Sequence, residues 1–477
     1  MDRFGTRAAD LAWIDGFVSS VRPYVRVRLE DGVLIKLPAE VFQLNAQALD
    51  LLDRTLRGEP ISRTLAALRV ESDAERLFQI HSFFCDVRDL LSGHLGDGSG
   101  RAATDVSPYA GSFTRYPVLA EIALTYQCNQ ACSFCYAGCG TAGATPGHAA
   151  RERHPRRICA GRTARDPLRS AMTRDEVFEV IDRIARDGRV PSVSFTGGEC
   201  TLRPELPDFI RRARARGLRV NLITNGVLCA SNDLVERLAA AGLTSAQVSL
   251  EGPTAEIHDR LTGRPGAFQR CLRGIRNLKD AGLHVHTNTT ICEENAEHLT
   301  GIIDLAGRLE LRQVSMNQAI PAGTSKLARN ARSRIAYSRI GPYVLRARDH
   351  ADRVGLRFHW YSPTPFCIFN PIAHGLGNKG CAACDGLLHV SPSGEVLPCS
   401  SFSRGVGSLL EAGFERVWFG RRARWFREKR MAHRICRTCE HFKLCQGACT
   451  LYWSGLGLAE LRRANRRRPA AVLRGRC

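Results

Sequence analysis

The spacing of apolar and polar residues changes near residue 118 and divides the chain into two kinds of structure. From Val118 onward, short apolar runs alternate with stretches in which apolar residues recur every three or four positions. This alternation indicates strands joined by amphipathic helices, as in parallel βα units. Six units are enough for a partial (β/α)6 barrel of the TIM type, which is an α/β fold. The expected strands are Leu119–Thr125, Val190–Thr196, Val220–Thr224, Ala246–Leu250, Val285–Thr290 and Gln313–Asn317.

The residues before this point predict a separate small domain over 1–95. Val25–Leu29 and Val33–Leu37 flank an Asp-Gly turn, and this pattern predicts a β-hairpin. Three helices are expected to follow, beginning at Pro38, near Ile61–Leu68 and at the capping box Ser72–Glu75. Strands followed by three helices are typical of a winged-helix-like α+β domain. Residues 96–116 are rich in Gly, Ser and Ala and predict a linker.

Length and charge narrow the class of protein. A chain of 477 residues suggests two to four domains. It has no apolar stretch of about 20 residues and no signal peptide, so we expect a cytoplasmic protein that does not enter a membrane. The net charge of +21 would attract nucleic acid, an anionic membrane or an acidic peptide, unless it is spread evenly over the surface. The basic runs 211–216 and 462–468 lack interleaved aromatic residues, which argues against nucleic acid.

The cysteine content changes this picture. Nineteen cysteines in a large chain without a signal peptide indicate metal ligands rather than disulfides. Fourteen of them lie in two regions, 128–159 and 367–477. The others are interpreted as buried small apolar residues: Cys85, Cys200, Cys229, Cys271 and Cys292.

Three cysteines follow the first predicted strand in the string CNQACSFC. Cys128, Cys132 and Cys135 have the spacing C-x3-C-x2-C, so one short loop supplies three thiolates. Iron–sulfur clusters normally take four thiolates, and three would leave one iron open. A zinc site or a redox dithiol is the alternative, although zinc sites rarely use this spacing with an aromatic residue before the last ligand.

This string resembles the cluster-binding loop of the radical S-adenosylmethionine (radical SAM) enzymes. The resemblance implies that the open iron binds the amino and carboxylate groups of SAM. One electron from the reduced 4Fe-4S cluster then cleaves SAM to methionine and a 5′-deoxyadenosyl radical. Phe134 occupies the position at which the family places a side chain against adenine.

Further motifs at the ends of the predicted strands agree with this family, in which chemistry lies at the C-terminal ends of barrel strands. Gly197, Gly198 and Glu199 resemble the GGE segment that meets the amino group of SAM. The stretch SLEGPTAEIHDRLTGRPGAF resembles that of the SPASM subgroup, with Glu251 in place of the usual Asp, and His258 in it is interpreted as structural. The resemblance implies three further SAM contacts: Asn225, Ser249 and Arg260, the last of which could instead serve a surface role.

The C-terminal cysteines over 367–477 resemble a SPASM domain, which carries two auxiliary 4Fe-4S clusters. Cys384-x9-Gly394-x4-Cys399 is followed by C-x2-C-x5-C-x3-C and a final cysteine. The resemblance assigns one set to a distal cluster: Cys436, Cys439, Cys445 and Cys477. It assigns Cys399 and Cys449 to a proximal cluster, with two more ligands from three candidates: Cys367, Cys381 and Cys384. A zinc ribbon is the alternative.

The domain over 1–95 resembles the PqqD-like domains, which pair the leader of a precursor peptide with an edge strand. Together the resemblances predict a radical SAM core over 117–325, a bridging segment over 326–366, and modification of a ribosomally made peptide, with an electron donor such as flavodoxin or ferredoxin. The alternatives are maturation of a protein enzyme or of a non-peptide cofactor such as haem, and a non-catalytic iron–sulfur or zinc scaffold. The glycine-rich, basic insertion over 137–167 carries Cys139 and Cys159 and has no assigned role.

Overall fold

The computed structural model describes residues 6–38, 40–92, 114–139 and 171–466. The chain forms two compact units, Met1–Leu119 and Ala120–Cys477. Across the described ranges, no helix has the length and apolar character needed to span a membrane.

The first unit packs four helices with a small antiparallel sheet whose strand order is β1-β2-β3. The elements are α1 (Trp13–Val21), β1 (Val25–Arg28), β2 (Val33–Lys36), β3 (Glu40–Gln43), α2 (Ala46–Leu56), α3 (Ile61–Leu68) and α4 (Ala74–Ser92). Its core joins residues from all four helices and from β1 and β2, among them Ile14, Leu34, Leu52, Leu65 and Phe84. The predicted hairpin and the helix near Ile61–Leu68 are therefore confirmed.

Two expectations for this unit are wrong. The helix expected from Pro38 begins only at Ala46, because Asn45 caps it by accepting the Ala48 N–H at 2.8 Å. The residues between them form β3, which pairs with β2 through Leu34 and Phe42. Helix α4 is capped by Asp73, which accepts the Arg76 N–H at 3.1 Å, rather than by Ser72.

The second unit is built on a ten-stranded sheet of order β10-β9-β8-β7-β6-β5-β4-β11-β12-β13. From β4 to β10, neighbouring strands are parallel. Their bounds are β4 (Leu119–Ala123), β5 (Ser192–Thr196), β6 (Arg219–Thr224), β7 (Ser245–Ser249), β8 (His284–Ile291), β9 (Gln313–Gln318) and β10 (Arg357–Trp360). All six predicted strands are confirmed, and β10 lies in the segment that we had expected only to bridge two domains.

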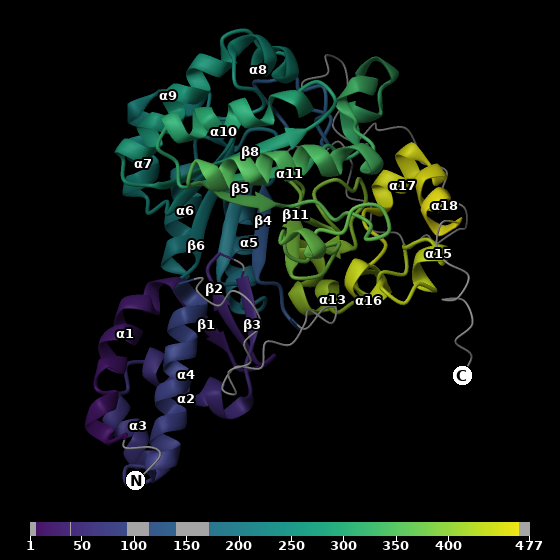
Figure 1. Cartoon of the computed structure of the whole chain (residues 1–477). Helices are drawn as coiled ribbons and strands as arrows, with labels where there is room; N and C mark the ends of the chain where they lie inside the picture. The colour runs from purple at the N-terminus through teal and green to yellow at the C-terminus, as the bar shows by residue number, and fades with distance from the viewer. Residues whose placement is uncertain (1–5, 39, 93–113, 140–170, 467–477) are drawn as a thin grey trace. The chain divides into compact units, whose positions relative to one another are not determined.

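Helices connect these strands and pack along the sheet (Figure 1). They are α5 (Arg174–Arg186), α6 (Leu206–Ala215), α7 (Asn232–Ala240), α8 (Ala255–Thr262), α9 (Ala267–Asp280), α10 (Leu299–Arg308) and α11 (Tyr337–Arg353). Alternation along the strands separates two faces: Phe195 on β5 packs against Phe209 of α6, while Ser194 on the opposite face bonds to Asn221 of β6 at 3.1 Å.

The C-terminal region continues the same sheet through a short antiparallel part. It contains β11 (Leu387–Val390), β12 (Glu395–Leu397) and β13 (Gly407–Ser408). Short helices follow: α12 (Leu409–Ala412), α13 (Phe414–Trp418), α14 (Arg421–Arg427), α15 (Arg434–Arg437), α16 (Phe442–Cys445), α17 (Thr450–Leu456) and α18 (Ala459–Arg466). Glu121 of β4 accepts a hydrogen bond from His389 of β11 at 3.1 Å, so this region is joined directly to the first parallel strand.

Candidate functional site

The cysteine loop leaves the C-terminal end of β4 and passes the glycine segment that follows β5. Gly198 donates its N–H to the Thr125 carbonyl at 2.7 Å, and Glu199 donates to Gln127 at 2.9 Å. A Cβ on Gly198 would lie 2.4 Å from the Gln127 carbonyl oxygen, and a Cβ on Gly197 2.2 Å from that of Thr125. In the structure, the two glycines therefore allow close approach of the cysteine loop itself.

Glu199 is the buried centre of a hydrogen-bond network between β5 and β6. Its side chain is fully enclosed, at 1% exposure. One carboxylate oxygen accepts from the Thr201 hydroxyl at 2.6 Å and the Thr224 hydroxyl at 2.8 Å, and the other accepts the Asn225 N–H at 2.8 Å. These donors satisfy the buried carboxylate, as burial requires.

Asn225 carries this network to the cysteine loop. Its side-chain NH2 donates to the Asn129 side chain at 2.7 Å and lies 3.9 Å from the Cys128 sulfur. Its side-chain oxygen accepts the Val227 N–H at 3.0 Å, which fixes the orientation of the amide. The structure thus brings Glu199, Asn225 and Cys128 together at the C-terminal ends of neighbouring strands.

Two distant segments support the opposite side of the loop. The Thr324 hydroxyl donates towards the carbonyls of Cys132 at 2.9 Å and Cys135 at 3.2 Å, and its N–H donates to Cys135 at 2.9 Å. The Ala131 N–H donates to Thr262 at 2.8 Å, and the Arg264 guanidinium bonds the Asn129 carbonyl. Sequence reasoning missed Thr324, for which no motif gives a signal, and Arg264, which lies within the quoted SPASM-like stretch.

The remaining predicted SAM contacts lie around this loop with different partners. Phe134 is half-buried against Ile257 and Leu261 of α8. Ser249 is the last residue of β7. Arg260 is half-exposed on α8 and pairs with Glu294 at 3.5 Å and Glu256 at 3.8 Å, so its contact with SAM stays a prediction.

Burial controls the pKa of two of the three thiols, and a hydrogen bond controls that of the third. It raises the pKa of Cys128 to about 11 and that of Cys132 well above its ordinary value. A hydrogen bond from the Cys139 thiol lowers the pKa of Cys135 to about 6 and leaves the proton on Cys139. Because metal ligands must be thiolates, loading iron onto Cys128 and Cys132 has to release protons.

Glu251 and His258 form a second buried pair of polar residues next to this site. Burial raises the pKa of Glu251 to about 8 and lowers that of His258 to about 4. The Glu251 N–H donates to the His258 ring at 3.2 Å, while its carboxyl group accepts the Thr290 N–H at 2.8 Å. His258 therefore orders the turn after β7, which agrees with a structural role.

The C-terminal cysteines separate into two groups in space. The first group is Cys381, Cys384, Cys399 and Cys449, and the Cys384 N–H donates to the carbonyl of Pro398, next to Cys399, at 2.9 Å. Burial raises the pKa of Cys384, Cys399 and Cys449 and the charge of Cys381 adds to each, while Arg427 and Lys429 oppose the rise at Cys384. The backbone N–H of Cys449 donates to the Tyr337 hydroxyl at 3.4 Å, which ties this group to α11.

The second group lines a cavity among α15, α16 and α18. Its cysteines are Cys367, Cys436, Cys439 and Cys445. Apolar side chains, including Phe442 and Leu461, form much of the remaining wall. Cys477, which we expected to complete this set, lies outside the described residues, as does Cys159.

The donor chemistry of these groups fits iron–sulfur clusters. Within the described ranges, no three His, Cys, Asp or Glu side chains lie close enough to share a single metal ion. A 4Fe-4S cubane has a different requirement, because each thiolate binds a different iron and the ligands surround a larger group. Three thiols on one loop and two sets of four thiols match that requirement in number and kind.

Comparison with known protein families agrees with this arrangement. The family described as "Radical SAM superfamily" matches residues 122–306, and the "Iron-sulfur cluster-binding domain", SPASM, matches residues 381–440. The chain therefore contains a radical SAM domain and a SPASM domain. It is thus a radical SAM enzyme, a class that binds a 4Fe-4S cluster and SAM, and SPASM domains bind auxiliary iron–sulfur clusters.

Individual proteins similar to this chain differ in what they make. The AdoMet-dependent heme synthase of Methanosarcina barkeri is 29% identical over 63% of this chain and 88% of its own. The mycofactocin maturase MftC of Mycobacterium ulcerans is 26% identical over 72% of this chain and 86% of its own. The structure of SuiB from Streptococcus suis bound to S-adenosylmethionine covers 90% of this chain and 94% of its own, with a TM-score of 0.61 and 16% identity, which shows a shared fold.

Proposed function

We propose that this protein modifies a ribosomally made precursor peptide by radical SAM chemistry. The observation that carries the proposal is the junction at the ends of β4, β5 and β6, where Cys128, Glu199 and Asn225 meet. Cys128, Cys132 and Cys135 would hold the first cluster. When bound, the cluster and SAM supply the 5′-deoxyadenosyl radical that abstracts hydrogen from the substrate.

The chain's own residues position and shield this chemistry. Asn225 holds Asn129 and Cys128 in place from β6, while Thr324 holds the Cys132 and Cys135 carbonyls from the opposite side. Gly197, Gly198, Ser249, Phe134 and Arg260 are proposed SAM contacts on the basis of family motifs. The three thiols are themselves only partly buried.

The auxiliary clusters are proposed for the two C-terminal cysteine groups. Cys381, Cys384, Cys399 and Cys449 lie together and would hold the proximal cluster. Cys436, Cys439 and Cys445 would hold the distal cluster. An electron donor such as flavodoxin or ferredoxin and a cytoplasmic location remain predictions.

A peptide substrate is supported by the first unit and by similar proteins. SuiB has also been solved bound to its precursor peptide SuiA, and it shares the fold with 15% identity and a TM-score of 0.61. Within the described residues, β3 pairs with β2 alone, so its other edge is available for an added strand. The Leu44 N–H points back to Gly32, and because N–H directions alternate along a strand, the Gln43 N–H points away from β2.

Haem synthesis is the second candidate, because several heme synthases are similar to the chain over about 60% of its length, for example 61% for the Oleidesulfovibrio alaskensis protein. A product assay separates the two. Reduced enzyme is incubated with SAM and either an iron porphyrin or a candidate precursor peptide, to be sought among short reading frames near this gene, and both products are analysed by mass spectrometry. A changed porphyrin and an unchanged peptide would contradict the peptide proposal.

The cysteine loop is tested by replacing Cys128, Cys132 and Cys135 together with Ala. We expect the triple variant to lose 5′-deoxyadenosine formation completely, because no thiolate remains to hold the first cluster. Cys85→Ala is the control, since Cys85 lies in the first unit. SAM cleavage that survives the triple change would contradict the central claim.

The β3 edge is tested with two variants at Gln43. Gln43→Pro removes the outward N–H and should weaken binding of the precursor peptide at least about tenfold, while Gln43→Ala keeps the N–H and should bind as the parent does. Fluorescence anisotropy with a labelled peptide measures both. Equal binding by the two variants would rule out strand addition at β3.

A further inference from the structure

We propose that Cys367 is the fourth thiolate of the distal cluster site, a position that the SPASM resemblance gives to Cys477. The inference rests on the proposed function, because it concerns one of the clusters proposed there. Its observation is the cavity that Cys367 lines together with Cys436, Cys439 and Cys445. The four sulfurs come from two separate chain segments that meet at this cavity.

The segment that carries Cys367 is held at the cavity by a contact with one of the other three cysteines. The Phe366 N–H donates to the Cys445 sulfur at 3.4 Å. Backbone N–H bonds to cysteine sulfur are typical of iron–sulfur sites, where they tune the cluster and orient the ligand. Pro365 and Phe366 also line the cavity, so the whole approach to Cys367 follows its wall.

The proximal group does not require Cys367. Cys381, Cys384, Cys399 and Cys449 already supply four thiols, and the Cys384 N–H donates to the carbonyl of Pro398, the neighbour of Cys399, at 2.9 Å. The sequence analysis gave three candidate cysteines for the last two ligand positions of the proximal cluster. The structure places two of them, Cys381 and Cys384, in the proximal group and the third, Cys367, at the distal cavity.

The thiol is also accessible before a cluster is present. Cys367 is exposed, whereas Cys436 is buried and Cys439 and Cys445 are intermediate. An exposed thiol at the edge of a largely apolar cavity suits a ligand that closes over a cluster seated on the other three. Loading the cluster should therefore change the chemical accessibility of Cys367 more than that of any thiol outside the two groups.

Iron content tests the assignment without relying on turnover. The full chain carrying Cys128→Ala, Cys132→Ala and Cys135→Ala serves as the parent, so that only auxiliary clusters contribute. After anaerobic reconstitution with iron and sulfide, we expect about eight irons per chain in the parent. In Cys367→Ala we expect one of the two clusters to give a changed Mössbauer spectrum, because the three remaining thiolates leave one of its irons without a protein sulfur. Cys477→Ala and Cys85→Ala should keep the iron content and the spectrum of the parent.

Alkylation of the unmutated chain gives a second measurement that does not depend on folding of a variant. Iodoacetamide should label Cys367 in the iron-free protein and leave it largely unlabelled after reconstitution, while labelling of Cys85 stays the same. A Cys367→Ala variant with the Mössbauer spectrum of the parent, or equal labelling of Cys367 in both states, overturns the inference. A spectrum that is changed by Cys477→Ala and unchanged by Cys367→Ala would assign the fourth position to Cys477.

The same measurements distinguish failure of the proposed function from failure of the Cys367 assignment. A parent that takes up no cluster iron contradicts the auxiliary clusters and this inference together. A parent with about eight irons and an unaffected Cys367→Ala variant contradicts this inference alone. Absence of SAM cleavage in the unmutated chain would count against the proposed function and leave the iron measurement valid.

Discussion

Gly198 lies where the backbone after β5 passes closest to the cysteine loop. A Cβ at this position would lie 2.4 Å from the Gln127 carbonyl oxygen and 2.9 Å from that of Tyr126. Neither atom belongs to a flexible side chain, so the loop itself would have to move. Cys128 follows Gln127 directly, and any such movement displaces a proposed cluster ligand.

We therefore expect Gly198→Ala to lower the free energy of unfolding by about 1–3 kcal/mol and to reduce iron uptake by the cysteine loop. Gly307→Ala in α10 is the matched control, because a Cβ there meets nothing within 4 Å. Alanine should be neutral or stabilising by up to about 1 kcal/mol at that position. Urea unfolding and iron analysis measure both variants, and equal results for the two would contradict the close-approach argument.

At the scale of single residues, the sequence allowed us to predict those site residues that lie close together along the chain in a recognisable motif. The cysteine triplet and the GGE segment each lie within a few residues of one another and directly after a predicted strand. Thr324 could not be predicted, because its contacts with Cys132 and Cys135 join residues about 190 positions apart. Sequence alone likewise could not place Cys367 in a different group from Cys381 and Cys384, because this depends on the path that the chain follows in space after β10.

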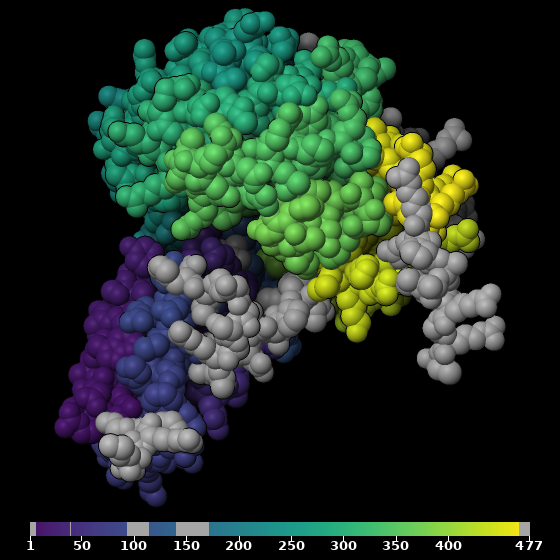
Figure 2. Space-filling model, in the orientation of Figure 1, coloured from purple at the N-terminus to yellow at the C-terminus, as the bar shows by residue number. Residues whose placement is uncertain are grey.

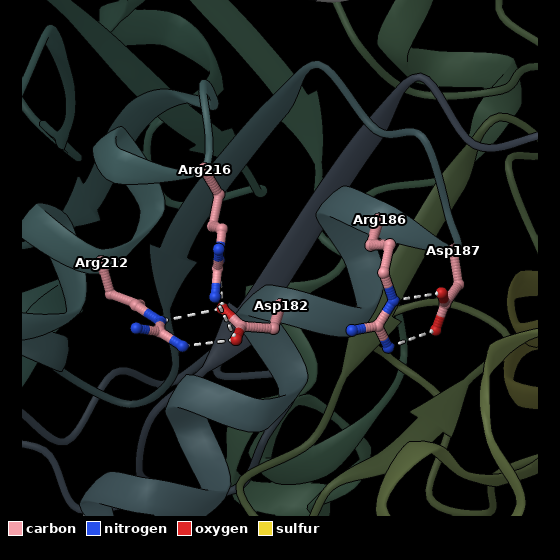
Figure 3. Close-up of polar contacts among 5 residues, drawn as sticks. All are labelled: Asp182, Arg186, Asp187, Arg212 and Arg216. Carbon is pink, nitrogen blue, oxygen red and sulfur yellow. Dashed lines mark hydrogen bonds and ion pairs between the residues drawn. The ribbon is translucent and has the colours of Figure 1, made fainter.

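At the scale of elements, Asp182 joins two neighbouring helices of the sheet's outer layer. It lies on α5 and accepts paired hydrogen bonds from Arg212 of α6 and from Arg216, the residue that caps α6 (Figure 3). The Arg216 distances are both 2.7 Å. Asp187 and Arg186 form a similar pair at 2.7 and 3.1 Å, but they are adjacent in sequence and join no second element.

Asp182→Asn should destabilise the protein in a pH-dependent manner. Hydrogen bonds and charge from Arg216 and Arg212 lower the pKa of Asp182 to about 2, so its contribution is present in full above the pKa of the unfolded chain, near 3.8. It is lost as the pH falls from about 5 towards 2. At pH 7 we expect a cost of about 1 kcal/mol, since the pair is partly exposed to solvent.

The measurement is urea unfolding of the iron-free protein at several pH values. The difference between the parent and Asp182→Asn should shrink steadily below pH 5. Asp187→Asn should stay within about 0.5 kcal/mol of the parent at every pH, because its partner is a neighbour in sequence. A constant difference for Asp182→Asn across this range would show that its charge does not contribute.

Element prediction succeeded where the apolar pattern was long and regular. Each of the six βα strands is a buried run between helices, and tertiary packing reinforces the local pattern. The prediction that a helix begins at Pro38 was wrong. The helix-favouring residues after Asn45 led us to extend the helix backwards over a segment of four residues that forms a strand. Val41 and Phe42 favour a strand, but only pairing with β2 makes so short a segment stable.

On the scale of the whole molecule, the compact first unit extends to Leu119, well beyond residue 95. Its last residues are held by a buried ion pair in the hairpin. Arg28 and Asp31 lie 2.8 Å apart at 5% and 4% side-chain exposure. The Arg28 guanidinium donates to the carbonyls of Tyr116 at 3.0 Å and Pro117 at 2.9 Å. Val118 packs against Val33 and Ile35 of β2.

These contacts predict that the segment 114–119 stabilises the first unit when it is produced alone. The free energy of unfolding of a fragment covering 1–119 should be about 2–4 kcal/mol larger than that of a fragment covering 1–95. The shorter fragment lacks Val118, which leaves the apolar side chains that it covers on β2 exposed, and it lacks the two carbonyl groups that accept hydrogen bonds from the buried Arg28 guanidinium. A fragment covering 1–113 is the control. It should be as stable as 1–95, since it also lacks the contacting residues 114–119.

Urea unfolding followed by circular dichroism measures all three fragments. If the three fragments unfold at the same midpoint, the hairpin contacts do not stabilise this unit. A higher stability for 1–113 than for 1–95 would instead assign the effect to residues 96–113.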